Sequence, residues 1–177
     1  MVDVYLGKRH PGRGLHVAPM RYVEFCMGFE IVDLDETWVA GLPVRSPKRA
    51  LGRLNDPALD LAWSSVLKQD IGGSLASIYT DFAPGIGSYN TQIVGYQCSS
   101  LSQVTRGHLI AKVPRARYAK FSAVGHFPDV MVRLWQQIDH AEEQREIART
   151  FTADYECYPH AYKIDLYLSI EQTGSAS

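Results

Sequence analysis

A duplicated α+β domain is the fold class that this sequence of 177 residues predicts. Two short amphipathic segments each contain a tryptophan, Trp63 and Trp135. A pair of strand-like segments follows each one, written DF(x)6YNTQIVGY in the first half and DY(x)6YKIDLYL in the second. Asp81 and Asp154 align the two halves, because they lie 18 and 19 residues after the respective tryptophans. This self-similarity indicates a repeat of strand, helix, strand and strand, and two copies favour approximate two-fold symmetry.

Eight segments are typical of β-strands, since they combine β-branched and aromatic residues and end at Gly, Pro, Asp or Ser. Pro84, Gly85 and Gly87 mark the turn inside the first pair, and Pro159-His160 marks the turn inside the second. We expect a mostly antiparallel sheet. In chain order, the predicted strands are residues 23–34, 36–44, 75–82, 90–97, 108–113, 117–124, 152–158 and 162–171.

The first of two main helices is predicted over residues 57–70. Asp56 can accept hydrogen bonds from the free backbone N–H groups of the first turn, and Pro57 at the first helical position has no N–H to lose. Apolar residues then recur on one face. Gly72-Gly73 ends the element.

The second helix begins at Pro128. Its apolar residues follow an i, i+3, i+4, i+7 pattern, which indicates one buried face. Residues 140–150 hold many Glu and Arg residues and few apolar ones, so we expect a solvated helical insert there. The apolar stripe consists of Met131, Leu134, Trp135 and Ile138.

Charge, hydropathy and cysteine content exclude several classes of protein. The chain has 18 Lys and Arg against 19 Asp and Glu, mixed along the sequence, so it lacks the basic stripe that nucleic-acid binding requires. No apolar run approaches the roughly 20 residues that span a bilayer, and no signal-peptide core is present. Three cysteines without CxxC spacing predict reduced thiols, and the histidines lack metal-ligand spacing. We therefore expect a cytoplasmic protein that needs no cofactor or metal and binds neither nucleic acid nor membrane.

One folded domain is expected over residues 20–171, with repeat one at about 23–97 and repeat two at about 107–171. Residues 1–19 are rich in Gly, Pro and basic residues and predict a flexible leader. Residues 172–177 predict a frayed tail.

The terminal hairpin is the leading candidate for a binding site, because it places acids among aromatic residues. Residues two apart on a strand share a face, so Glu156 goes with Tyr158 and Asp165 goes with Tyr167. A buried carboxylate without a partner is costly, and a cationic ligand would supply the missing charge. Nearby aromatic rings would add cation-π attraction of roughly 0.5 to 2 kcal/mol each. The alternative is that these acids face solvent and the aromatic residues belong to the core.

Trp63 and Trp135 share this ambiguity, since each lies on a helical stripe that could belong to the core. Their matching positions suggest instead that they form the two sides of a ligand groove between the helices. Asp81 and Asp154 are expected to have structural roles at strand ends.

Five motifs of the sequence occur in the same order as in one known family. They are GLPVRS at 41–46, SIYTDF at 77–82, YAKFSAVGHFPDVMVRLW at 118–135, DYECY at 154–158 and KIDLYLSIE at 163–171. Together they resemble the GyrI-like, or bacterial transcription activator effector-binding, domain, a duplicated strand-helix-strand-strand domain found in AraC-type and MerR-type regulators and as a standalone protein.

The resemblance covers residues 20–171 and implies an acidic, aromatic-lined groove for cationic amphipathic molecules. It assigns to this groove the acids Glu156 and Asp165 and the helix aromatics Trp63 and Trp135. For a ligand-binding protein we expect further cavity walls from Tyr79, Tyr158 and Tyr167.

The resemblance implies a standalone effector-binding protein for small cationic aromatic molecules, connected with transcription regulation or multidrug sensing. The leader is too short for a helix-turn-helix, so we expect no DNA-binding half in this sequence. A second copy or a separate regulator subunit would be the protein partner. Two alternatives stay open, a small-molecule hydrolase with Glu156 as general base and a gyrase-inhibitor-like protein that binds another protein. We expect binding rather than catalysis.

Overall fold

The computed structural model describes residues 28–45, 56–84 and 89–171. The predicted leader and tail, Cys26 and the turn residues Gly85 and Gly87 lie outside these ranges. Within them the chain forms eight strands and two main helices, as the sequence predicts, and a short 3-10 helix at Leu101–Gln103. The helices are α1 (Pro57–Leu67) and α2 (Asp129–Glu143). The strands are β1 (Glu30–Leu34), β2 (Thr37–Arg45), β3 (Leu75–Thr80), β4 (Thr91–Cys98), β5 (Leu109–Val113), β6 (Ala116–Val124), β7 (Asp154–His160) and β8 (Lys163–Ser169).

The strands form one antiparallel sheet in the order β1-β6-β8-β7-β3-β4-β2-β5. This order is symmetric about the contact between β7 and β3. One half contains the unit β2, α1, β3 and β4, and the other contains β6, α2, β7 and β8, which confirms the predicted duplication. The edge strands are exchanged, because β1 precedes β2 in the chain but pairs with β6, and β5 precedes β6 but pairs with β2.

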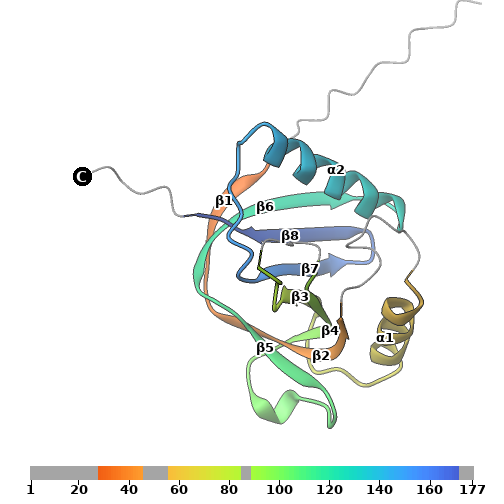
Figure 1. Ribbon diagram of the computed structural model, residues 1–177. Coiled ribbons are helices and arrows are strands. Elements are labelled where there is room, and N and C mark those ends of the chain that lie inside the picture. Colours follow the sequence, from red (N-terminus) through yellow and green to blue (C-terminus); the bar gives the residue numbers. More distant parts are fainter. Residues whose placement is uncertain (1–27, 46–55, 85–88, 172–177) are drawn as a thin grey trace, which may run out of the picture.

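Both helices lie on one face of the sheet (Figure 1). α1 packs against β2 and β4, and α2 packs against β6, so β3 and β7 lie between them. The Asp56 carboxylate accepts hydrogen bonds from the N–H groups of Ala58 at 3.0 Å and Leu59 at 3.2 Å, which confirms the predicted helix cap. The predicted stripe on α2 is buried at Met131, Leu134 and Ile138.

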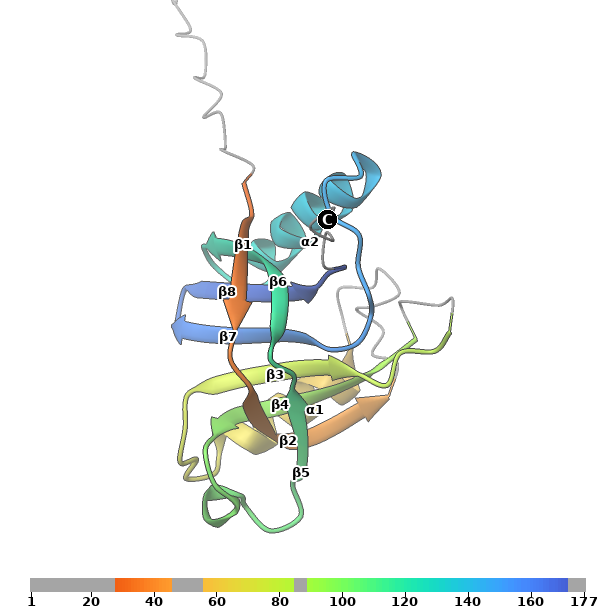
Figure 2. The ribbon, with the colours of Figure 1, turned by 90° about the vertical axis from the view of Figure 1, so that its left-hand side faces the viewer.

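The opposite face of the sheet is covered by the sheet's own edges. Only two residues link β1 to β2, and only two link β5 to β6, although the members of each pair lie in opposite halves of the sheet. The sheet therefore bends until its edges meet, and Figure 2 shows the β1–β2 and β5–β6 segments running across the other strands. The buried residues of this second core are Val39, Ala76, Ile78, Ile93, Val113, Tyr118, Ala153 and Tyr155.

The helical insert predicted at 140–150 is wrong beyond Glu143, where α2 ends. Ile147 is buried in the core beneath α2, and the side chain of Arg149 is only 9% exposed. Local composition suggested solvent exposure because Arg149 is charged. Its burial depends on an acidic partner, Asp154, that lies on another element.

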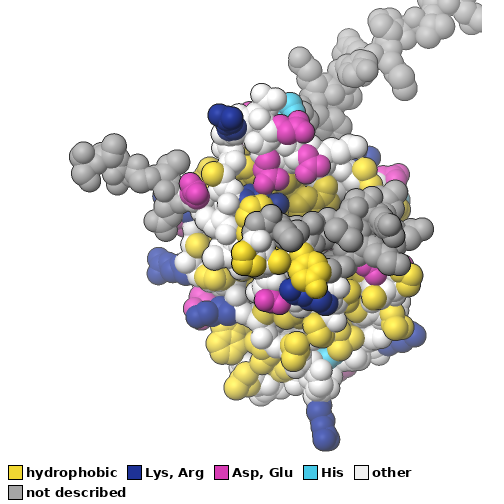
Figure 3. Space-filling model, in the orientation of Figure 1, with side chains coloured by type: hydrophobic (Ala, Val, Ile, Leu, Met, Phe, Trp, Pro, Cys, Tyr) yellow, Lys and Arg dark blue, Asp and Glu magenta, His cyan; other side chains and the backbone are white. Residues whose placement is uncertain are grey.

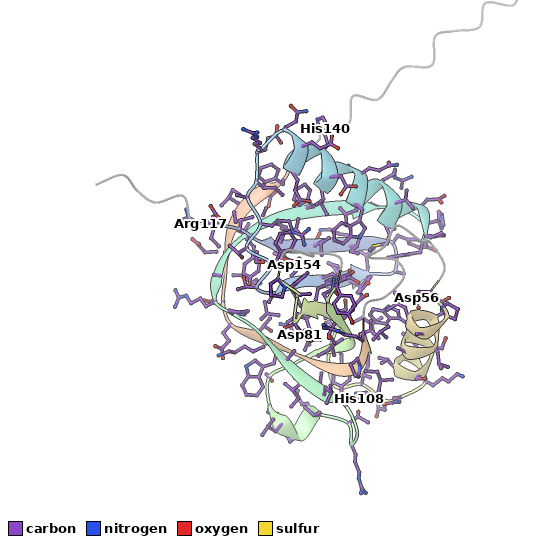
Figure 4. All side chains as sticks on the ribbon, in the orientation of Figure 1. Asp56, Asp81, His108, Arg117, His140 and Asp154 are labelled. Carbon is purple, nitrogen blue, oxygen red and sulfur yellow. The ribbon has the colours of Figure 1, made fainter. Side chains whose placement is uncertain are left out.

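The alignment of the two halves at Asp81 and Asp154 is also wrong at the level of single strands. Asp81 follows the end of β3, whereas Asp154 begins β7. Because β3 and β7 are antiparallel neighbours with Tyr79 opposite Asp154, both aspartates lie at the same end of the sheet (Figure 4). Residues related by the two-fold symmetry would lie at opposite ends. The expected strand-end roles are observed, since Asp81 forms an ion pair with Arg45 and Asp154 forms one with Arg149.

Candidate functional site

Glu156 lies near the centre of the sheet on the face that carries the helices, and its side chain is fully buried. The hydroxyl group of Tyr79, on β3, donates to Glu156 Oε2 at 2.7 Å. The hydroxyl group of Tyr158, two residues along β7, donates to Glu156 Oε1. One phenol therefore meets each oxygen of the carboxylate.

The two tryptophans flank these phenols. Trp63 on α1 packs edge-on against Tyr158, with ring centroids 5.4 Å apart. Trp135 on α2 packs edge-on against Tyr79 at 6.2 Å. Phe127 adds a further contact with Tyr158 at 5.9 Å. Five of the seven predicted residues thus form one continuous set from α1 to α2, which we name the Glu156 cluster and which consists of Trp63, Tyr79, Trp135, Glu156 and Tyr158.

Glu156 differs in its partners from the other buried carboxylates of strands β7 and β8. Asp154 forms an ion pair with Arg149 and accepts hydrogen bonds from the N–H and hydroxyl groups of Ser169. Within the described ranges, no Lys, Arg or His side chain forms an ion pair with Glu156. Phenol hydroxyl groups stabilise a carboxylate, but they leave its charge uncompensated. The Glu156 cluster therefore holds a buried acid that lacks a described cationic partner.

Asp165 and Tyr167 lie on the opposite face of the sheet from Glu156. The register places Asp165 opposite Cys157 and Glu156 opposite Leu166, so the two acids point to different sides. Asp165 accepts a hydrogen bond from the Ser122 hydroxyl group at 2.7 Å. Asp165 Oδ2 lies 3.7 Å from Lys120 Nζ, and Asp165 Oδ1 lies 3.6 Å from Lys163 Nζ. The charge of Asp165 already has partners, and the structure does not bring it together with the Glu156 cluster.

Burial beside Asp165 also controls the chemistry of Cys157. Removal from water, followed by the charge of Asp165, raises the pKa of the Cys157 thiol to about 11. At pH 8 only about one thiol in a thousand would then be ionised. We expect iodoacetamide to modify Cys157 at least about tenfold more slowly than glutathione at pH 8, with the rate rising until about pH 11. Peptide mass spectrometry over a pH series measures this rate, and modification as fast as glutathione would contradict it.

A separate pocket of about 490 Å³ lies where β2 begins and β4 ends. It contains none of the seven predicted residues. Its acid, Glu36, is 3.0 Å from Lys112 Nζ and accepts a hydrogen bond from the Trp38 indole N–H. The hydrogen bonds from Lys112 and Trp38 lower the pKa of Glu36. This carboxylate therefore has a cationic partner, unlike Glu156.

Sequence reasoning missed two buried polar residues near the Glu156 cluster. Ser77 lies directly opposite Glu156 on β3, and Gln92 lies on the next strand, β4, opposite Tyr79. Both are fully buried, and the Gln92 amide Nε2 donates to Ser77 Oγ at 3.0 Å. Alternation along β3 could have placed Ser77 on the face of Tyr79. Gln92 could be found only from the register between β3 and β4.

The family of the chain follows from a match over most of its length. The model of the integron-associated effector binding protein family matches residues 30–170. The chain belongs to this family. The resemblance to GyrI-like effector-binding domains is confirmed.

Solved structures share the fold of this effector-binding protein at low sequence identity. An integron cassette protein from the mobile metagenome of Vibrio cholerae has a TM-score of 0.65 and 19% identity, with 81% of this chain and 96% of that chain covered. The structure of SAV2435 bound to tetraphenylphosphonium has a TM-score of 0.60 and 9% identity, covering 82% and 94%. The C-terminal domain of EcmrR has a TM-score of 0.56 and 10% identity, covering 82% and 98%. No curated protein gives a significant sequence match.

Proposed function

We propose that this effector-binding protein binds small aromatic cations, with Glu156 as the charge partner. The supporting observation is the contrast among the buried carboxylates of β7 and β8. Asp154 and Asp165 have basic partners, whereas Glu156 receives hydrogen bonds from Tyr79 and Tyr158. A cation would compensate the Glu156 charge in a site where water screens little.

The remaining members of the cluster favour an aromatic ligand. Trp63 and Trp135 are partly exposed, as is Tyr158, so their rings offer surface to a bound molecule. Ring faces attract cations by roughly 0.5 to 2 kcal/mol each. Because Glu156 is fully buried, a ligand must displace a covering side chain, and Tyr158 is the more exposed of its two phenol partners.

Charge on α2 supports the same preference. Figure 3 shows Asp and Glu side chains gathered over α2, on the face that contains the helices. Such a field raises the encounter rate of cations with the surface. The structure of SAV2435, a protein with the same fold, has been solved with bound tetraphenylphosphonium, which is itself an aromatic cation. We infer a role in sensing or sequestering such compounds, as an effector-binding unit of a regulatory system.

Thermal unfolding with ligands of matched shape tests the proposal. Tetraphenylphosphonium and tetraphenylborate have four identical rings and opposite charge. We expect the cation, at about 100 times its dissociation constant, to add roughly 2.7 kcal/mol, which is about 5 to 10 °C in Tm. Tetraphenylborate should give no shift, and Glu156→Gln should remove the shift from the cation.

Asp165→Asn is the matched control, because it removes a second buried carboxylate from the opposite face of the sheet. Each variant is compared with its own ligand-free Tm, so that a change in basal stability does not enter the result. We expect Asp165→Asn to retain the cation shift. Equal shifts for both ions, or a cation shift that survives Glu156→Gln, would exclude Glu156 as the charge partner. Mass spectrometry of the recovered compound would reveal any hydrolysis.

A further inference from the structure

A second buried polar group lies beside Glu156 on the same face of the sheet. Ser77 is directly opposite Glu156 across the β3–β7 ladder, and the Gln92 side chain extends along β4 to reach Ser77. Side chains directly opposite on antiparallel strands have Cβ atoms about 5 Å apart. Gln92 and Glu156 therefore approach Ser77 from two sides, and the three residues are fully buried.

The amide of Gln92 uses only part of its hydrogen-bonding capacity. Its Nε2 donates to Ser77, but its carbonyl oxygen Oε1 is buried and has no hydrogen-bond partner among the residues that the structure describes. A buried acceptor without a donor costs free energy, and most such groups in folded proteins have a partner. Gln92 contacts Ser77, and Ser77 lies opposite Glu156, whose charge has no described cationic partner. A ligand group that carries both a positive charge and N–H bonds would satisfy both residues.

We propose that Gln92 Oε1 accepts a hydrogen bond from the ligand, and that the physiological ligands are protonated primary or secondary amines. This inference rests on the proposed function and specifies its ligand class. One N–H of the ammonium group would meet the Glu156 carboxylate and another would meet Gln92. Quaternary ammonium and phosphonium ions satisfy the charge of Glu156 but leave Gln92 without a donor. They bind, but more weakly than a matched amine.

The test compares two ligands that share one aromatic group. (Naphthalen-2-ylmethyl)ammonium has three N–H bonds, and (naphthalen-2-ylmethyl)trimethylammonium has none. Isothermal titration calorimetry at pH 7 gives the ratio of their dissociation constants for each protein. In Gln92→Met, a change that keeps side-chain size but removes the acceptor, we expect the preference for the primary amine to fall about tenfold, as for the loss of one hydrogen bond to a charged group.

Gln97→Met is the control, because it makes the same substitution on the same strand but on the opposite face of the sheet. It should keep the wild-type ratio. Gln92→Met should unfold close to the wild-type temperature, because it removes a buried acceptor without a described donor but also removes the hydrogen bond from Nε2 to Ser77 Oγ. If the ratio of the two dissociation constants were the same in wild type and in Gln92→Met, the role of Gln92 would be refuted, but the proposed function would not. If neither ammonium binds the wild-type protein, the proposed function fails as well.

Discussion

Replacing Arg149 with Met is expected to lower the stability of the fold by about 3 to 5 kcal/mol. The Arg149 guanidinium contacts the buried carboxylate of Asp154 and lies 3.7 Å from Glu142. Removing one member of a buried ion pair leaves the other charge uncompensated, which is the costly case. For a domain of this size the loss is a fall of roughly 10 °C in Tm, measured by calorimetry or circular dichroism.

Two further variants separate this effect from a general loss of packing. Arg149 also lies over the Phe151 ring, 4.3 Å from its centroid, and Met retains part of that contact. The double variant Arg149→Met with Asp154→Asn removes both charges and should recover a large part of the loss. Arg117→Met is the control, because its ion pair with Asp33 is exposed and contributes little. A Tm for Arg149→Met equal to that of the control would refute the prediction.

Gly95→Ala is expected to destabilise the fold by roughly 3 kcal/mol. Gly95 on β4 pairs with Gly41 on β2, and Gly41 pairs with Leu109 of β5 on its other side. A Cβ atom at Gly95 would lie 1.9 Å from the carbonyl oxygen of Ala40, and one at Gly41 would lie 2.0 Å from that of Val94. Backbone atoms in a paired sheet cannot move away as a flexible side chain can, so we expect Tm to fall by about 6 to 12 °C.

Gly72→Ala provides the comparison for this prediction. A Cβ atom there would meet Gln103 Cβ at 3.6 Å, an ordinary contact, and the position is exposed. Its Tm should stay within about 2 °C of the wild-type value. A Tm for Gly95→Ala that is as close to the wild-type value as that of Gly72→Ala would contradict the prediction, because it would mean that the paired backbones of β2 and β4 make room for a methyl group.

The local elements of this fold could be predicted from sequence, because their causes are local. Asp56 and Pro57 fix the start of α1, and the turn residues separate the hairpins. Arg149 could not be placed correctly, since its burial depends on Asp154 of another element. The alignment of Asp81 with Asp154 was wrong for a similar reason. Asp81 follows the end of β3 and Asp154 begins β7, and their spacing from the tryptophans does not show at which end of its strand each one lies.

The candidate site was predictable in part for the same reason. Alternation along β7 placed Glu156 beside Tyr158, and the paired helices supplied Trp63 and Trp135. Which face the helices cover depends on strand order, and therefore Asp165 and Tyr167 could not be separated from Glu156 in advance. Gln92 required the register of β4 against β3, which no local pattern contains.

The exchange of edge strands between the two halves determines how the chain can fold. Among the described strands, β1 is synthesised first and pairs only with β6, so its ladder, which begins with Glu30 opposite Lys120, cannot form until β6 has been made. β5 in turn pairs back onto β2 of the first half. Neither half has its full set of backbone hydrogen bonds until the other exists. Long-range pairing of this kind slows the search for the native state. A chain interrupted between β4 and β5 would leave β1 without its partner and β2 and β3 each with one unpaired edge.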